Sequence, residues 1–325
     1  MATSAGTLTR GRLPQAERKP RSLWSDAWKR LTRNKAAVLG IVFIVLMILV
    51  AIFADLLAQH NPVQQNAGIS LRPPVWVQTG NPATSGLSEY PLGTDSLGRD
   101  MLSRLIFGAR VSLIVGLIPT TIVVVIGVTF GLIAGYAGGW IDNLMMRIVD
   151  IVTAFPDLLF LITVGVAFRD TPFGQAFNGL LLIFVALAIV GWTGLTRLVR
   201  GQVLSLKQKE FIEAARTVGV SRRSILFKHL LPNAMAPVIV AISFAIPAFI
   251  LAEAVLTIIG VGMRPSVNPD NPFPTSWGVL MSDGFASINS NPWALFFPVL
   301  LVSGTMLAFT SLGDGLRDAL DPRDN

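Results

Sequence analysis

Residues 36–57 read AAVLGIVFIVLMILVAIFADLL, and Asp55 is their only charged residue. An α-helix rises about 1.5 Å per residue, so a run of this length can cross a hydrocarbon core about 30 Å thick. The run is too long for the apolar region of a secretory signal, and no small-residue cleavage site accompanies it. We therefore expect it to remain in the membrane as a signal anchor.

The composition of the whole chain agrees with a membrane protein. Of the 325 residues, 52% are hydrophobic and 14% are charged, whereas a soluble domain carries about a quarter charged residues. The mean hydropathy is +0.61. Six apolar runs predict spans at residues 36–58, 106–136, 143–168, 179–197, 234–260 and 293–312. The sequence therefore predicts an all-α membrane protein with six transmembrane helices.

The predicted spans also set the organisation of the chain. They divide it into a cytoplasmic tail with an interfacial helix (1–35), a first transmembrane helix (36–58), an extracytoplasmic loop (59–105), a core of five transmembrane helices (106–312) that contains a polar cytoplasmic loop (200–232), and a second cytoplasmic tail (313–325). We expect residues 1–20 to be disordered. We expect the loop 59–105 to be ordered only in part and by its partners. The prolines of the loop 261–292 exclude a regular helix there.

A short amphipathic pattern precedes the first span. Trp24, Trp28 and Leu31 recur at i, i+4 and i+7. Cations are interleaved with them at Lys29, Arg30, Arg33 and Lys35. The pattern predicts an interfacial helix with its tryptophans at the lipid headgroups and its cations towards anionic lipid. The alternative is a flexible basic tail.

The distribution of cations predicts the orientation. Nine Lys or Arg residues lie between Arg10 and Lys35, ahead of the first span. The loop between spans four and five adds Arg200, Lys207, Lys209, Arg216, Arg222, Arg223 and Lys228. Cytoplasmic loops carry the excess of Lys and Arg, so we expect both termini and this loop to be cytoplasmic. Arg99, Arg104 and Arg110 then fall on the outer side, and we expect Asp95 and Asp100 to offset them in part.

Several classes of function lack the residues they need. The chain has no cysteine, so it has no disulfide and no thiolate metal site. Its only histidines are His60 and His229, and we expect neither to be catalytic nor to bind a metal. No G-x-x-x-x-G-K-[ST] loop is present, so we expect no ATP hydrolysis by this chain. The net charge of +7 lies beside apolar runs, which does not indicate nucleic-acid binding.

A polar stretch interrupts the spans. Residues 210–233 read EFIEAARTVGVSRRSILFKHLLPN. Its helical periodicity puts Phe211, Ala214, Ala215 and Val218 on one narrow apolar stripe. We interpret the stretch as a docking lever that is rigidly joined to spans four and five, and the alternative is a solvated loop.

The ends of two helices can be predicted in this stretch. Gly219 stops the first helix, because glycine readily takes the left-handed conformation just past a C-terminus. Ser221 is an N-cap for a second short helix that runs through Ile225 to Leu230. Pro232 is expected to end that helix.

Three carboxylates lie at membrane depth, where they are costly and usually face the bundle or a water-filled path. Asp150 and Asp157 lie seven residues apart in span three, hence on roughly one face, and Glu253 lies deep in span five. Structural pairing, for example of Asp150 with Arg147, is the alternative to a translocation role. Glu253 has no cation nearby in the sequence, so it is the better candidate to line a path.

The polar stretch resembles the EAA loop of ABC importer permeases. The residues that match are Glu213, Ala214, Ala215, Gly219, Leu231 and Pro232, while His229 departs from a usually apolar position. Three further segments resemble the dipeptide/oligopeptide/nickel branch: PLGTDSLGRDMLSRLIFGARVSLIVG from Pro91, AGYAGGWIDNLMMRIVDIVTAFPDLLF from Ala134 and LGDGLRDALDPR from Leu312. The resemblance extends from about residue 22 onward and is closest to the C-type permease.

The resemblance implies a fold, a mechanism and partners. The fold is that of a type I ABC importer permease in a prokaryotic inner membrane, with the EAA loop forming cytoplasmic coupling helices. The stripe of Phe211, Ala214, Ala215 and Val218 would then seat in a groove of an ATPase, and Glu213 would pair with a cation there. The implied partners are a homologous permease, two ABC ATPase subunits that bind ATP and Mg²⁺, and an extracytoplasmic binding protein.

One segment departs from the family pattern. The passage GVGMRPSVNPDNPFPTSWG from Gly260 is longer than usual, and the extra residues lie around Asn268 to Phe273. They are expected on the outer side, where a binding protein would dock.

Two other classes of protein stay open at this point. A self-contained ion-coupled secondary transporter would use Asp150, Asp157 or Glu253 as ion sites and would not need the polar hairpin. A structural or assembly protein of the membrane would have no path at all. The cargo is also open between a dipeptide, a longer peptide, nickel and another small solute.

Overall fold

The structure is a computed structural model that describes residues 23–320, with side chains from Ala27 onward. The predicted disorder of residues 1–20 and the side chain of Trp24 lie outside this part. The helices are α1 (Leu23–Leu31), α2 (Lys35–Ile52), α3 (Ala54–Leu57), η1 (Ala67–Ile69), α4 (Met101–Ala137), α5 (Gly139–Thr153), α6 (Asp157–Ala167), α7 (Pro172–Gln175), η2 (Ala176–Gly179), α8 (Leu180–Leu206), α9 (Glu210–Thr217), α10 (Arg222–Ser224), η3 (Ile225–Leu230), α11 (Leu231–Ile258), α12 (Trp277–Ala286) and α13 (Trp293–Leu320).

Among residues 23–320, five helical stretches are long and apolar enough to cross a membrane. They are Lys35–Ile52, Met101–Ala137, Pro172–Leu206, Arg222–Ile258 and Trp293–Leu320. A sixth crossing is possible only if α5 and α6, which meet at a bend of 73°, count as one span. The prediction of an all-α, membrane-spanning fold is confirmed.

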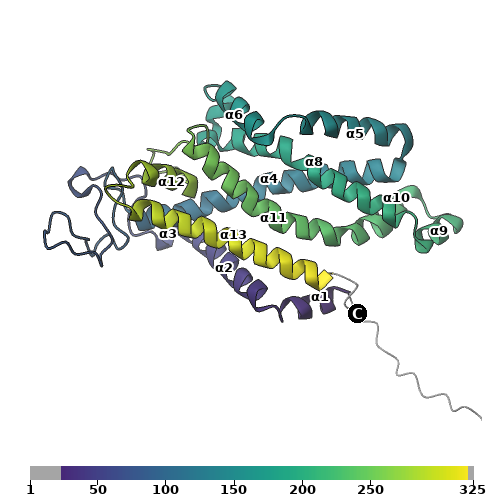
Figure 1. Cartoon of the computed structure of the whole chain (residues 1–325), viewed down its shortest axis with the longest axis horizontal. Helices are drawn as coiled ribbons and strands as arrows, with labels where there is room; N and C mark the ends of the chain where they lie inside the picture. Colours follow the sequence, from purple (N-terminus) through teal and green to yellow (C-terminus); the bar gives the residue numbers. More distant parts are fainter. Residues whose placement is uncertain (1–22, 321–325) are drawn as a thin grey trace, which may run out of the picture.

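Span three, predicted over 143–168, is broken into the two helices α5 and α6 rather than being one continuous helix. The helix stops at Thr153 and resumes at Asp157, with Pro156 in an extended conformation between them. Proline lacks an N–H and disfavours the helical conformation of the residue before it, so the break falls where the sequence requires it. Figure 1 shows α5 and α6 lying along the outside of α8.

Glycines set the closest helix packing. Gly127, Gly131 and Gly135 form a stripe on α4 that lies against α8. A Cβ atom added to Gly131 would lie only 2.6 Å from the Cβ of Val199. Small residues at every fourth position let helix backbones approach closely in a membrane, so α4 and α8 form the central pair of the bundle.

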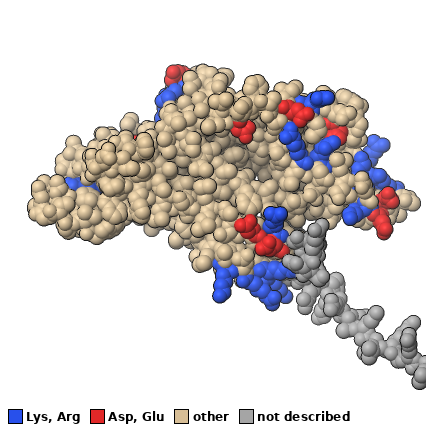
Figure 2. Space-filling model, viewed as in Figure 1, with Lys and Arg blue, Asp and Glu red and all other residues tan. Residues whose placement is uncertain are grey.

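The two ends of the bundle differ, and we name them by their contents. The hairpin end carries α9 and α10, and the loop end carries residues 58–100 and α12 (Figure 1). On the face seen in Figure 2, charged side chains gather at the hairpin end and beside α1, while the loop end shows few of them.

The helix α1 forms as predicted, but its faces differ from the prediction. Ala27 and Leu31 are buried in a small cluster with Ala37 and Ala319, whereas Trp28 is 61% exposed. Leu31 therefore packs inside the protein rather than on the lipid-facing stripe. Insertion of Trp28 at the headgroups stays a prediction.

The loop end is folded more fully than the sequence suggested. Residues 59–105 were expected to be ordered only in part, yet Thr94, Asp95 and Asp100 are buried. Asp100 caps α4 by accepting a hydrogen bond from the Ser103 backbone N–H at 2.9 Å. The prolines exclude a helix only as far as Pro274, because Ser276 caps α12 through the Val279 N–H at 3.1 Å. The helix α12 was not predicted.

The three arginines that disagree with the charge rule are all paired. Arg99 and Arg104 both contact Asp95 and both lie 3.0 Å from the Asp283 carboxylate. Arg110 lies 2.7 Å from Asp55. The predicted compensation by Asp95 is confirmed, so these cations add little free positive charge to the loop end.

Candidate functional site

The hairpin that follows α8 consists of α9, a turn at Gly219, and a second arm made of α10 and η3. Gly219 has φ of +79°, and its N–H donates to the Arg216 carbonyl at 3.0 Å. The Val220 N–H reaches back to the Ala215 carbonyl, also at 3.0 Å. This pair of bonds closes the C-terminus of α9 in the manner of a Schellman motif, and the predicted glycine stop is confirmed.

The second arm of the hairpin is not a separate helix. Ser221 caps it as predicted, accepting from the Ser224 N–H at 3.4 Å. Pro232, however, does not end it, because the proline lies in the first turn of α11, where its missing N–H is tolerated. A π-helical turn at η3 precedes it, and the Asn233 side chain donates to the His229 carbonyl at 2.6 Å. The arm therefore runs on into the span as one stretch, Arg222–Ile258.

The hairpin presents one face to the bundle and the other to solvent. Ile212, Ile225 and Leu230 are at most 1% exposed and belong to a core cluster that includes residues of α5 and α8. On the opposite face Phe211 is 43% exposed and Val218 is 83% exposed. The stripe predicted from the sequence is therefore the face that this chain leaves uncovered. The anchor, Ile212, was missed, although a lone apolar residue opposite a stripe is a usable signal.

The small residues of the stripe and the neighbouring Glu213 are also accessible at the surface. Ala214 is exposed and Ala215 half-buried, so the surface between Phe211 and Val218 is shallow. Glu213 is exposed and forms no ion pair with any residue that the structure describes. Charged side chains gather at the hairpin end, which carries this stripe (Figure 2).

Two polar contacts brace the base of the hairpin. Arg200 of α8 binds Asp142 of α5 through two bonds of 2.6 and 2.7 Å. Lys207 donates to the Tyr136 carbonyl at the end of α4, at 2.7 Å. Because only residues 207–209 separate α8 from α9, these contacts fix the first arm to the bundle.

The carboxylates predicted for a path have different surroundings. Asp150 pairs with Arg197 of α8 at 2.9 Å, and not with Arg147. Asp157 is exposed and is the first residue of α6. The break in span three separates the two aspartates, so the prediction that they share one helical face is wrong.

Glu253 is fully buried and ties α11 to α12. One of its oxygens accepts from the Thr257 hydroxyl at 2.9 Å and from the Ser276 hydroxyl at 2.7 Å. A Cβ on Gly278 would lie 2.8 Å from the other oxygen. Ser276 is also the N-cap of α12, so Glu253 holds the start of that helix.

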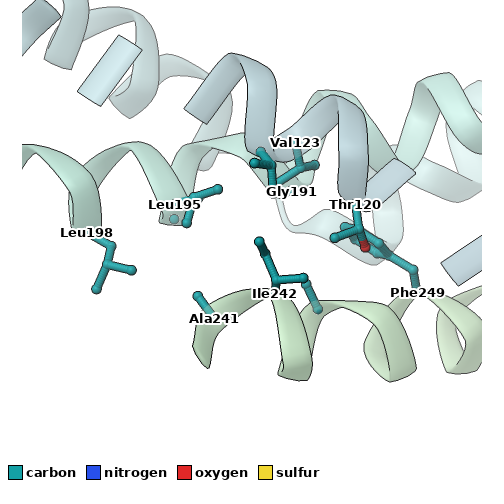
Figure 3. A pocket seen from close by; sticks show the side chains of 11 residues that line it. Thr120, Val123, Gly191, Leu195, Leu198, Ala241, Ile242 and Phe249 are labelled. Atoms are coloured by element: carbon teal, nitrogen blue, oxygen red, sulfur yellow. The ribbon is translucent and has the colours of Figure 1, made fainter. Parts of the chain in front are cut away.

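A cavity of about 290 Å³ lies between α4, α8 and α11 (Figure 3). It is lined by Thr120, Val123, Val124, Gly191, Gly194, Leu195, Leu198, Ala241, Ile242, Ala245 and Phe249. The hydroxyl of Thr120 is engaged by the Gly116 carbonyl at 2.6 Å, so the lining is almost wholly apolar. None of the three carboxylates lines it. This cavity was not predicted, because only charged residues were considered as candidates at membrane depth. The two glycines of α8 that line it are the feature of the sequence that could have indicated it.

Two family profiles match the sequence. Residues 127–324 match the family described as binding-protein-dependent transport system inner membrane component. Residues 22–74 match the N-terminal transmembrane domain of oligopeptide transport permease C.

Several relatives are similar over nearly the whole chain. The oligopeptide transport system permease protein OppC of Bacillus subtilis strain 168 is 38% identical, over 96% of this chain and 94% of the relative. OppC of Haemophilus influenzae is 40% identical, over 96% and 93%. The dipeptide transport system permease protein DppC of Bacillus subtilis is 40% identical, over 93% and 86%.

A solved structure has a similar arrangement of helices. The inward-facing MetNI methionine ABC transporter aligns with a TM-score of 0.52 and 19% sequence identity, over 68% of this chain and 96% of that chain. At this identity the likeness concerns the fold alone, which is that of a type I ABC importer permease.

Proposed function

This chain belongs to the family of binding-protein-dependent transport system inner membrane components, and we propose that it is one of two homologous permease subunits in a bacterial importer of peptides. It is a multi-pass protein of the inner membrane and, like its relatives, a transport subunit rather than an enzyme. Peptides are proposed as cargo because the relatives are named for oligopeptide and dipeptide transport.

The observation that carries the mechanism is the uncovered stripe on a braced hairpin. Exposed Phe211 and Val218 would enter a groove on a cytoplasmic ABC ATPase, and small Ala214 and Ala215 would allow close approach. Glu213, which has no ion pair among the described residues, would meet a cation of that subunit. ATP and Mg²⁺ would be bound by the two ATPase partners.

The continuous helix gives this docking a route to the membrane. Because Arg222–Ile258 is one helical stretch, a push on the hairpin would move α11 as a rigid body rather than bend a linker. The same helix supplies Ala241, Ile242, Ala245 and Phe249 to the cavity. ATPase closure would thereby change access to the cavity from one side to the other.

We propose that the cavity is half of the translocation path and that the second permease completes it. An apolar lining with small residues suits cargo whose side chains vary, since it makes few directional demands. The hairpin end and both termini would face the cytoplasm, and the loop end would face an extracytoplasmic binding protein. A contribution of Asp150 and Asp157 to the path stays a prediction. Glu253 holds α12 instead of lining the cavity.

The experiment compares two glycines of matched conformation. Gly219 at the hairpin and Gly260 at the loop end both follow a helix with positive φ and have open space around them. The full transporter, with its ATPase subunits and binding protein, is reconstituted in vesicles carrying wild type, Gly219→Asp or Gly260→Asp. We expect Gly219→Asp to lose ATP-driven uptake and to bind the ATPase subunits weakly, and Gly260→Asp to retain both.

Two results would contradict the proposal. Equal effects of the two substitutions would mean that backbone strain, and not the coupling surface, explains the loss. Uptake that follows a proton gradient in the absence of ATP would favour the ion-coupled secondary transporter.

A further inference from the structure

The extra residues between α11 and α12 form an ordered loop. The Ser266 N–H donates to the Pro274 carbonyl at 2.8 Å. The Ser266 hydroxyl accepts from the Asn268 N–H and from the Asn271 side chain, both at 3.1 Å. Three prolines, at positions 265, 269 and 272, further restrict the backbone. A loop that is ordered in advance loses little entropy on binding.

This loop joins two other segments of the loop end. The Asn61 side chain donates to the Pro269 carbonyl at 3.3 Å. The Asn178 side chain donates to the Phe273 carbonyl at 3.1 Å. The loop therefore bridges the segment after α3 and the turn before α8, and it is a fixed part of the surface.

A polar pocket of about 460 Å³ lies under one side of the loop. It is lined by Asp55, Ala58, Gln59, His60, Asn61, Pro62, Phe107, Arg110, Pro269, Asp270, Asn271 and Pro272. Its one arginine is already engaged, since Arg110 donates to the Ala51 carbonyl at 2.9 Å and to Asp55 at 2.7 Å. Asp270 is exposed and forms no ion pair with any described residue.

The free charge of the loop end is negative. The six lysines of the chain all lie before residue 36 or between residues 207 and 228, far from this end in the sequence. The arginines there already contact carboxylates or backbone carbonyls: Arg72, Arg99, Arg104, Arg110, Arg169 and Arg264. Glu89 lies 3.5 Å from the His60 ring, so Asp270 is the carboxylate of the pocket that is left for a partner that brings cations.

We propose that the loop 265–273 and this pocket are the docking surface for the binding protein, which places a lysine or arginine side chain beside Asp270. The inference rests on the proposed function, because it takes the loop end to be extracytoplasmic. It assigns to the extra residues a role in choosing the binding protein. A cation at the rim of an interface acts mainly on association and on salt dependence.

The test measures how tightly the binding protein binds the complete transporter in nanodiscs, at low and at high salt. Asp270→Asn and Ala83→Lys each add one unit of positive charge to the loop end, but exposed Ala83 does not line the pocket. We expect the dissociation constant to rise about two- to fivefold for Asp270→Asn. Asp270→Lys adds repulsion, so we expect about tenfold or more. Ala83→Lys should stay within twofold, and high salt should reduce all the shifts.

Two results would overturn the inference. One is an unchanged dissociation constant for Asp270→Lys. The other is an equal shift for Asp270→Asn and Ala83→Lys, which would indicate the general charge of this end instead of the pocket. Because binding is measured without transport, a failure of ATP-driven uptake in the wild type would contradict the proposed function by itself and leave the docking comparison readable.

Discussion

The hairpin end and the loop end differ in how far the chain itself covers or pairs their charged and apolar side chains. At the hairpin end Phe211 and Val218 are exposed, and Glu213 has no ion pair among the described residues. At the loop end Asp95 and Arg104 are buried and paired with each other. The loop end is thus complete in itself except around Asp270, whereas the hairpin end leaves an apolar surface uncovered. The difference separates the end at which the chain completes its own fold from the end at which we propose that it meets a partner subunit.

The largest expected effect lies in the buried ion cluster of the loop end. Asp95→Ala should leave Arg99 and Arg104 with a single shared carboxylate, that of Asp283, which lies 3.0 Å from both. Breaking a buried ion pair by removing one partner costs about 3–5 kcal/mol. Thermal unfolding of the purified subunit in nanodiscs measures the loss. Asp55→Ala is the control, since its carboxylate is 71% exposed and the expected cost is about 0–1 kcal/mol. Equal costs would mean that the cluster does not stabilise this end.

The next effect lies at Glu253. Glu253→Ala removes the acceptor of the Thr257 and Ser276 hydroxyls, which are buried. An unsatisfied buried polar group costs about 1–3 kcal/mol. Glu253→Gln keeps an acceptor oxygen, so we expect it to unfold at nearly the temperature of the wild type. If both variants lose the same stability, the carboxyl group itself is required and the anchoring account is wrong.

The smallest effect on stability is expected at the base of the hairpin. Arg200→Lys replaces a two-bond contact with Asp142 by a single one, because lysine has no planar fork. The pair is partly exposed, so the stability should fall by about 1 kcal/mol or less. Coupling should suffer more, and we expect more ATP to be hydrolysed for each peptide imported. An unchanged ratio would show that this brace plays no part in coupling.

Local signals in the sequence predicted the hairpin well, because its turn depends on adjacent residues. Gly219 ends α9 through its positive φ, and the Ser221 side chain caps the turn that follows. Both predictions are confirmed. Pro232 was misjudged because proline is equally suited to the first turn of a helix, and only the continuation into α11 decides between the two positions. The docking role of the stripe stays a prediction.

Contacts between distant segments could not be read from the sequence in the same way. Asp150 pairs with Arg197 of another helix and not with Arg147 of the same helix. The helix α12 is short and follows several prolines, so its cap at Ser276 and its anchor at Glu253 become apparent only in three dimensions. The cavity is formed by residues of three predominantly apolar helices, so only the pair of glycines in α8 marks it in the sequence.

The most direct test of the account is whether an ATPase subunit covers the stripe on α9. The chain has no cysteine, so Val218→Cys and Val267→Cys each give a single thiol, at positions that are 83% and 79% exposed. The rate of maleimide labelling is measured in the permease pair alone and in its complex with the ATPase subunits, without the binding protein. The account predicts that the ATPase subunits protect the thiol at position 218 and leave the one at position 267 unchanged. An unchanged labelling rate at position 218 in a complex that still contains the ATPase subunits would contradict it.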